Sequence, residues 1–172
     1  MTLQNFFSQN QKVALAFSGG VDSAYLLYAA IQAGCDIHAY YVKSAFQPEF
    51  ELEDAKRLAK ELKIDMTVLE LDVLSDSNIT DNPANRCYFC KKKIFSKIIE
   101  AAKADGYDII IDGNNASDDV NDRPGMKAVQ ELQVRSPLRE CGITKSEVRR
   151  LSKEAGLFTW DKPAYACLAT RI

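Results

Sequence analysis

Short apolar runs alternate with amphipathic stretches along most of the chain. The apolar runs predict buried strands over 13–17, 36–42, 65–71 and 107–111. Residues 49–62 instead place Leu52, Ala55, Leu58, Ala59 and Leu62 on one face, which predicts an amphipathic helix. Further helices are expected over 3–10, 24–31, 87–104, 125–132 and 145–155.

This alternation predicts an α/β fold, with a parallel sheet covered by helices on both faces and joined by right-handed crossovers. In such folds the ligand binds above the carboxyl ends of the strands. Thr144 and Glu147 form a capping box that begins the last helix, and Gly156 ends it. Polar loops are expected over 72–86 and 115–124, and an irregular tail over 157–172.

Chain length, net charge and cysteine content limit the classes of protein to which the sequence can belong. The 172 residues suffice for one α/β domain, and the net charge of −2 provides no general basic field for nucleic acid. No apolar run of about 18 residues is present and the first residues lack a basic segment, so we expect no membrane span and a cytoplasmic protein. The five cysteines are expected to be ligands, nucleophiles or core residues rather than disulfides.

The stretch Ser18-Gly19-Gly20-Val21-Asp22-Ser23 joins the first strand to the next helix. Adjacent glycines let the backbone turn sharply and approach a ligand closely. N–H groups at a helix start attract phosphate, and Ser18 and Ser23 add hydroxyl donors. Asp22 would repel a bare phosphate, so it indicates a magnesium ion between the two. The commoner phosphate loop needs a Lys after its last Gly, which is absent here.

This stretch resembles the S-G-G-x-D-S signature of the PP-loop ATP pyrophosphatase superfamily. The resemblance implies an adenine nucleotide alpha hydrolase-like fold that binds ATP and Mg²⁺. Members transfer AMP to a substrate oxygen, release pyrophosphate, and then displace AMP with a nucleophile.

Further motifs make the resemblance more specific. They are Arg86-Cys87-Tyr88-Phe89-Cys90-Lys91, Asp112-Gly113-Asn114-Asn115, Asn121-Asp122-Arg123-Pro124-Gly125, Arg135-Ser136-Pro137-Leu138 and residues 160–171. Together they resemble the ATP-dependent sacrificial sulfur transferases (the LarE type) over nearly the whole chain. The resemblance implies an enzyme that adenylylates a pyridinium-dicarboxylate mononucleotide and inserts sulfur. Its product would be a thiocarboxylate for nickel-pincer cofactor synthesis.

Cys87 and Cys90 form a Cys-x-x-Cys pair at a helix start, where the dipole favours thiolates and a metal can be chelated. In the family, three cysteines at the positions of Cys87, Cys90 and Cys167 imply a [4Fe-4S] cluster with one iron open for an extra sulfide. Zinc held by three cysteines and water is the rival metal. A sacrificial Cys167, consumed as the sulfur donor, is the second alternative.

The candidate residues are assigned to catalysis, metal binding or nucleotide binding. Asp22, Arg123 and Cys167 are assigned to catalysis, and Cys87, Cys90, Cys167, Asp112 and Asp122 to metal binding. The residues assigned to nucleotide binding are Ala16, Phe17, Ser18, Gly19, Gly20, Asp22, Ser23, Tyr41, Val42, Asp112, Gly113, Arg135 and Arg171. Arginines are chosen here because a guanidinium matches the geometry of a phosphate.

Residues 1–156 are expected to form the PP-loop ATP-binding domain and 157–172 an active-site tail. Family members continue further, so a C-terminal domain is expected to be absent. We expect a small nucleotide substrate, no nucleic acid and a possible homo-oligomer. Two alternatives remain: a PP-loop enzyme that thiolates tRNA, and a nucleotide-binding remnant without turnover.

Overall fold

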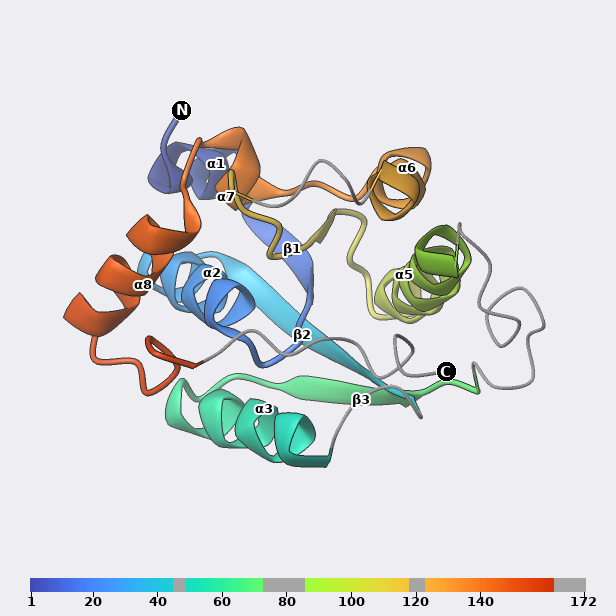
Figure 1. The fold of residues 1–172 in the computed structure, drawn as a ribbon, viewed down its shortest axis with the longest axis horizontal. Helices are drawn as coiled ribbons and strands as arrows, with labels where there is room; N and C mark the ends of the chain where they lie inside the picture. The colour runs from blue at the N-terminus through green and yellow to red at the C-terminus, as the bar shows by residue number, and fades with distance from the viewer. Residues whose placement is uncertain (45–48, 73–85, 118–122, 163–172) are drawn as a thin grey trace.

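The computed structural model describes residues 1–44, 49–72, 86–117 and 123–162. It describes only the backbone of residues 86, 87 and 123–125. Within these limits the chain forms a single parallel sheet with helices packed on both of its faces (Figure 1).

Four strands form the sheet in the order β3-β2-β1-β4. They are β1 (Lys12–Ala16), β2 (Asp36–Lys43), β3 (Met66–Glu70) and β4 (Ile110–Ile111). The register places Leu15 of β1 beside Ala39 of β2 on one side and Ile111 of β4 on the other. The chain therefore steps outward from β1 to β3 and then returns to the opposite side of β1. The strand order therefore reverses between β1 and β4, and open α/β sheets bind ligands at the carboxyl ends of the strands beside such a reversal.

Seven helices are described: α1 (Leu3–Gln9), α2 (Val21–Gln32), α3 (Glu49–Glu61), α5 (Arg86–Ala104), α6 (Arg123–Glu131), α7 (Pro137–Glu140) and α8 (Lys145–Glu154). Thr2 begins α1 by accepting a hydrogen bond from the Asn5 N–H, at 3.1 Å. Thr144 does the same for α8 through Glu147 N–H, at 3.4 Å. The N-cap predicted at Thr144 is therefore confirmed, and its hydroxyl also donates to Glu147 Oε1 at 3.2 Å.

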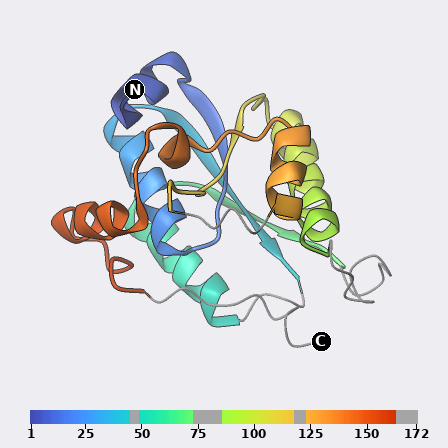
Figure 2. The same cartoon turned by 45° about the horizontal axis from the view of Figure 1, so that its top comes forward.

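The two faces of the sheet carry separate apolar layers, because successive side chains of a strand point to opposite sides. Val13 and Leu15 pack with α1, α2 and α3, whereas Ala14 packs with α5 and α6. All three side chains are fully buried, as expected for the centre of a parallel sheet. Burying a side chain the size of Leu15 stabilises the fold by roughly 1.5–3 kcal/mol. Figure 2 shows α5 and α6 together on one side of the strands and α2 and α3 on the other.

The predicted α/β architecture and its doubly covered sheet are confirmed, with small differences in the element bounds. The strand expected over 107–111 pairs only at Ile110–Ile111. Tyr107 is not in the strand because its N–H closes the end of α5 on the Ala102 carbonyl, at 2.8 Å. The sequence reading also missed α7, which Pro137 begins. Most of the loop predicted over 72–86 lies outside the described residues. Among the described helices, none is long and apolar enough to cross a membrane.

Candidate nucleotide site

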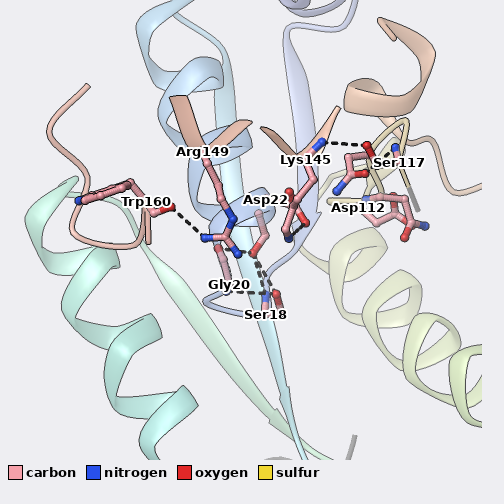
Figure 3. Close-up of polar contacts among 11 residues, drawn as sticks. Ser18, Gly20, Asp22, Asp112, Ser117, Lys145, Arg149 and Trp160 are labelled. Carbon is pink, nitrogen blue, oxygen red and sulfur yellow. Dashed lines mark hydrogen bonds and ion pairs between the residues drawn. The ribbon is translucent and has the colours of Figure 1, made fainter. Parts of the chain in front are cut away.

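The stretch Ser18–Ser23 forms a compact turn between β1 and α2 (Figure 3). The Ser18 N–H donates to Ser23 Oγ at 3.3 Å, and the two serine hydroxyls lie 3.0 Å apart. Gly20 is the N-cap of α2 and offers no side-chain acceptor to the first turn of the helix. The serines thus hold the turn in shape, while N–H groups of the first turn remain available to an anion.

Two glycines allow the surrounding elements to approach this loop closely. Gly19 has φ of +77°, and a Cβ there would lie 3.1 Å from the Glu51 carbonyl oxygen of α3. Gly113, which follows β4, would place a Cβ 3.0 Å from the Ser23 nitrogen. Any side chain at Gly113 would therefore press on the first turn of α2. Gly19 thus lets α3 approach the loop, and Gly113 lets the chain after β4 approach the first turn of α2.

Asp22 has one carboxylate oxygen paired and one unpaired. Its Oδ2 lies 2.7 Å from Lys145 Nζ at the start of α8. Its Oδ1 is buried and has no hydrogen-bond partner among the described residues. A buried carboxylate oxygen without a partner costs free energy, which a cation bound at Oδ1 would offset. Oxygen ligands of this kind suit Mg²⁺, so Asp22 fits the ion that the sequence predicts beside a triphosphate.

Lys145 is a candidate residue that the sequence analysis missed. Its backbone N–H donates to Ser117 Oγ at 3.1 Å, which ties the start of α8 to the chain that follows β4. A lysine in the first turn of a helix opposes the helix dipole, so its position needs a separate reason. The salt bridge to Asp22 supplies one. A lysine at this unfavourable position in a helix is therefore the sequence signal that would have identified Lys145.

Asp112 lies at the end of β4 and is buried. Its Oδ1 accepts from Ser136 Oγ at 2.7 Å and from the Asn114 N–H at 3.1 Å, and its Oδ2 accepts from Asn114 Nδ2 at 2.8 Å. These bonds shape the turn that carries Gly113 to α2. The structure therefore places Asp112 at the expected edge of the sheet. Its role toward magnesium or ATP stays a prediction.

The strand ends predicted to contact adenine lie at the same edge. Ala16 ends β1, and the Phe17 N–H donates to the Tyr40 carbonyl at 3.0 Å, which extends the pairing toward Tyr41 and Val42. The Tyr41 hydroxyl is buried without a partner among the described residues. Burial, together with the carboxylates of Glu51 and Glu49, raises the pKa of Tyr41.

Lys162 is the second residue that the sequence analysis left without a role. Its Nζ donates to the Gly19 carbonyl at 3.0 Å and pairs with Asp54 Oδ2 of α3 at 2.9 Å. Nearby, Arg149 Nη1 donates to the Trp160 carbonyl at 2.9 Å (Figure 3). Lys162 lies in the 160–171 motif that the sequence analysis noted, but the sequence does not indicate that it meets Gly19 and Asp54.

The predicted arginines and acidic residues are only partly described. Arg135 pairs with Glu140, at 2.6 Å between Nη2 and Oε1, and its guanidinium lies 4.7 Å from the Phe6 ring. No polar contact joins it to the phosphate loop of this chain, Ser18–Ser23, within the described ranges. Arg123 begins α6, but its side chain is not described. Asp122, Arg171 and Cys167 lie outside the described residues.

Cys87 and Cys90 both belong to the start of α5, as predicted, and the Cys90 side chain is half-buried. Residues three apart on a helix lie on one side, so the two could reach one metal. The side chain of Cys87 is not described. The described residues contain no group of three or more His, Cys, Asp or Glu that could hold a metal ion. The cluster therefore stays a prediction.

The parallel sheet, the reversal of its strand order beside β1 and the phosphate loop define a PP-loop protein of the adenine nucleotide alpha hydrolase-like fold. NMN synthetase from Francisella tularensis shares this fold, with a TM-score of 0.72 over 96% of this chain and 74% of that one, at 18% identity. The model of the family "Thiamine biosynthesis protein (ThiI)" matches residues 7–168. The chain belongs to this family.

Two relatives are similar over most of the chain. An uncharacterised protein of Synechocystis sp. is 40% identical over 99% of this chain and 64% of its own length. The pyridinium-3,5-bisthiocarboxylic acid mononucleotide synthase of Lactiplantibacillus plantarum is 36% identical over 94% of this chain and 59% of its own length. The chain therefore spans less than two thirds of either relative.

Proposed function

We propose that the chain binds ATP and Mg²⁺ at Ser18–Ser23 as the ATP-binding part of a sulfur transferase. The observation that carries the proposal is the unpaired, buried Oδ1 of Asp22 beside the start of α2. The β- and γ-phosphates accept hydrogen bonds from the loop N–H groups and the serine hydroxyls. Asp22 would hold Mg²⁺, and Lys145 adds a positive charge on the same side.

The similarity to the pyridinium-3,5-bisthiocarboxylic acid mononucleotide synthase supports the substrate class. A carboxylate oxygen of a pyridinium-dicarboxylate mononucleotide attacks the α-phosphorus of ATP. The bond between the α- and β-phosphates breaks, and pyrophosphate leaves beside Lys145, which balances part of its charge. Asp22 would hold a Mg²⁺ ion that supplies further positive charge. A sulfide-level sulfur then attacks the acyl carbon of the adenylate. AMP leaves, and a thiocarboxylate remains.

Other residues would position the reactants. The strand ends at Ala16–Phe17 and Tyr41–Val42 contact the adenine through their backbone groups. Asp112 orients ATP or its metal ion together with Asp122. Arg123, Arg135 and Arg171 bind phosphate or substrate, because arginine pairs well with oxyanions.

Sulfur supply is assigned to Cys87, Cys90 and Cys167. Thiolates are the usual ligands of a [4Fe-4S] cluster, and the half-buried Cys90 at the start of α5 fits that chemistry. When bound, such a cluster would supply an iron open to an additional sulfide. Zinc held by the same thiolates, or a Cys167 consumed once per product, are the other outcomes that an experiment must distinguish.

Incubation of the anaerobically purified protein with Mg²⁺, ATP and the pyridinium-dicarboxylate mononucleotide tests the proposal. Mass spectrometry should detect AMP and a product in which sulfur replaces oxygen. Unmodified tRNA is the matched control and should give no AMP. AMP formed only with tRNA would support the thiolating alternative, and ATP binding without AMP would indicate a nucleotide-binding remnant.

A further inference from the structure

Lys162 joins three parts of the molecule that are distant in sequence. It ends the turn at 157–162 after α8, and its side chain is only 10% exposed. Its ammonium group lies between the Gly19 carbonyl of the phosphate loop and the Asp54 carboxylate of α3. A nearly buried ammonium is costly unless it is paired and hydrogen-bonded. The two acceptors therefore hold the turn, the loop and α3 together.

The hydrogen bond from Lys162 to the Gly19 carbonyl restrains the part of the loop to which the proposed function assigns phosphate binding. The Gly19 carbonyl and the Gly20 N–H belong to one planar peptide group, so fixing the carbonyl also fixes the direction of that N–H. Gly20 is the N-cap of α2, and its N–H donates to Ser18 Oγ at 3.3 Å. Lys162 thus sets the orientation of a peptide at the entrance to the anion site without occupying the site itself.

The turn at 157–162 is fastened to both neighbouring helices. Arg149 of α8 donates to the Trp160 carbonyl, and Lys153 Nζ lies 4.7 Å from the Trp160 ring. Arg57 of α3 lies 3.9 Å from the Phe158 ring. The turn therefore bridges α8 and α3 beside the phosphate loop, as Figure 1 shows in red. In the sequence, Cys167 follows this turn closely.

We propose that Lys162 is a positioning residue that couples nucleotide binding at the phosphate loop to the turn at 157–162. This inference rests on the proposed function, because it needs ATP on the loop. Coupling between two sites is reciprocal: a bound nucleotide tightens the turn, and loss of Lys162 weakens nucleotide binding.

Trp160 is the only tryptophan of the chain, so its fluorescence reports on this turn. Mg²⁺ with α,β-methylene ATP binds without cleavage and should change that fluorescence in the native protein. In Lys162→Met most of this change should disappear. Calorimetry should show binding weakened by roughly threefold to tenfold, since one charge-assisted hydrogen bond behind the loop is lost. Lys162→Arg keeps a charged donor and should restore part of the fluorescence change.

Two variants separate this coupling from other effects. Lys153→Met removes a different cation from the Trp160 ring and should leave the nucleotide response intact. Asp54→Asn keeps the hydrogen bond to Gly19 and should also respond. If Lys162→Met does not fold, amide exchange in the native protein replaces it, and nucleotide should slow exchange over 157–162.

The outcomes distinguish this inference from the proposed function. An equal Trp160 response in Lys162→Met and the native protein, or unchanged amide exchange at 157–162 with nucleotide bound, overturns the inference alone. A native protein in which calorimetry detects no nucleotide binding overturns both.

Discussion

The amine of Lys145 lies 2.7 Å from a carboxylate oxygen of Asp22, although 123 positions separate them in the sequence. The pair places the first turn of α8 against the first turn of α2. It also leaves the other Asp22 oxygen buried and unpaired, within the described part of the chain. An ammonium group and an unpaired carboxylate oxygen therefore lie close together at the start of α2, and the proposed function assigns them to the phosphates and to Mg²⁺.

Asp22→Asn should abolish most Mg²⁺-dependent cleavage of ATP. The amide cannot replace a carboxylate as a metal ligand, and loss of one such electrostatic contact costs about a hundredfold or more in rate. Stability should change by less than about 1 kcal/mol, because the amide oxygen still accepts a bond from the partly exposed Lys145. AMP formation and thermal unfolding measure the two effects. Unchanged turnover would remove Asp22 from the mechanism.

Lys145→Met should lower kcat/KM for ATP by about tenfold to a hundredfold, as expected for one lost charged contact. Lys145→Arg keeps the charge and should retain more activity. Lys153→Met, on the same helix, removes a charge remote from Asp22 and serves as the control. Steady-state assays of pyrophosphate release give all three values. Equal activity in Lys145→Met and Lys153→Met would contradict the role.

Gly113→Ala should weaken nucleotide binding through steric pressure alone. The added methyl would lie 3.0 Å from the Ser23 nitrogen and displace the first turn of α2, at a cost of about 1–3 kcal/mol in stability. Gly34→Ala is the control. Its φ of +75° costs an alanine about 1–2 kcal/mol in stability, but no atom lies within 4 Å of the added methyl. Calorimetry should show weakened binding only for Gly113→Ala. Equal affinities would contradict the close contact.

Asp112→Asn should reduce both stability and adenylylation. Three donors, from Asn114 and Ser136, converge on the carboxylate, and an amide group would turn a donor toward at least one of them. The expected loss in stability is about 1–3 kcal/mol. Ser136→Ala removes only one of these bonds and should cost less. An Asp112→Asn protein with unchanged magnesium dependence and rate would refute a role for Asp112 in the site.

The sequence predicts the parts of this site that are local, and misses those that depend on packing. The turn at Ser18–Ser23, the strand end at Asp112 and the cap at Thr144 follow from glycine, strand and capping patterns over a few residues. Lys145 and Lys162 acquire their partners only when distant segments meet. Arg135 illustrates the same limit, since α1 places Phe6 under its guanidinium and α7 supplies Glu140.

Sequence context separates Cys35 and Cys141 from the three predicted ligands, Cys87, Cys90 and Cys167. Cys35 is buried, and burial together with Asp36 raises the pKa of its thiol to about 11. Since the thiolate is the nucleophile and the metal ligand, a raised pKa keeps Cys35 protonated and unreactive near pH 8. Burial also raises the pKa of Cys141. Both residues are therefore suited as controls.

Cys87→Ala, Cys90→Ala and Cys167→Ala should each lose iron, acid-labile sulfide and sulfur transfer after anaerobic purification, because three thiolates must hold one cluster. Cys35→Ala and Cys141→Ala should retain all three properties. AMP formation should survive in every variant, since adenylylation needs only the phosphate loop and its metal. If Cys167→Ala alone lost sulfur transfer, with iron absent throughout, the cluster would be refuted in favour of a sacrificial cysteine. Zinc found in place of iron would refute the cluster and assign the three thiolates to a structural or Lewis-acid metal instead.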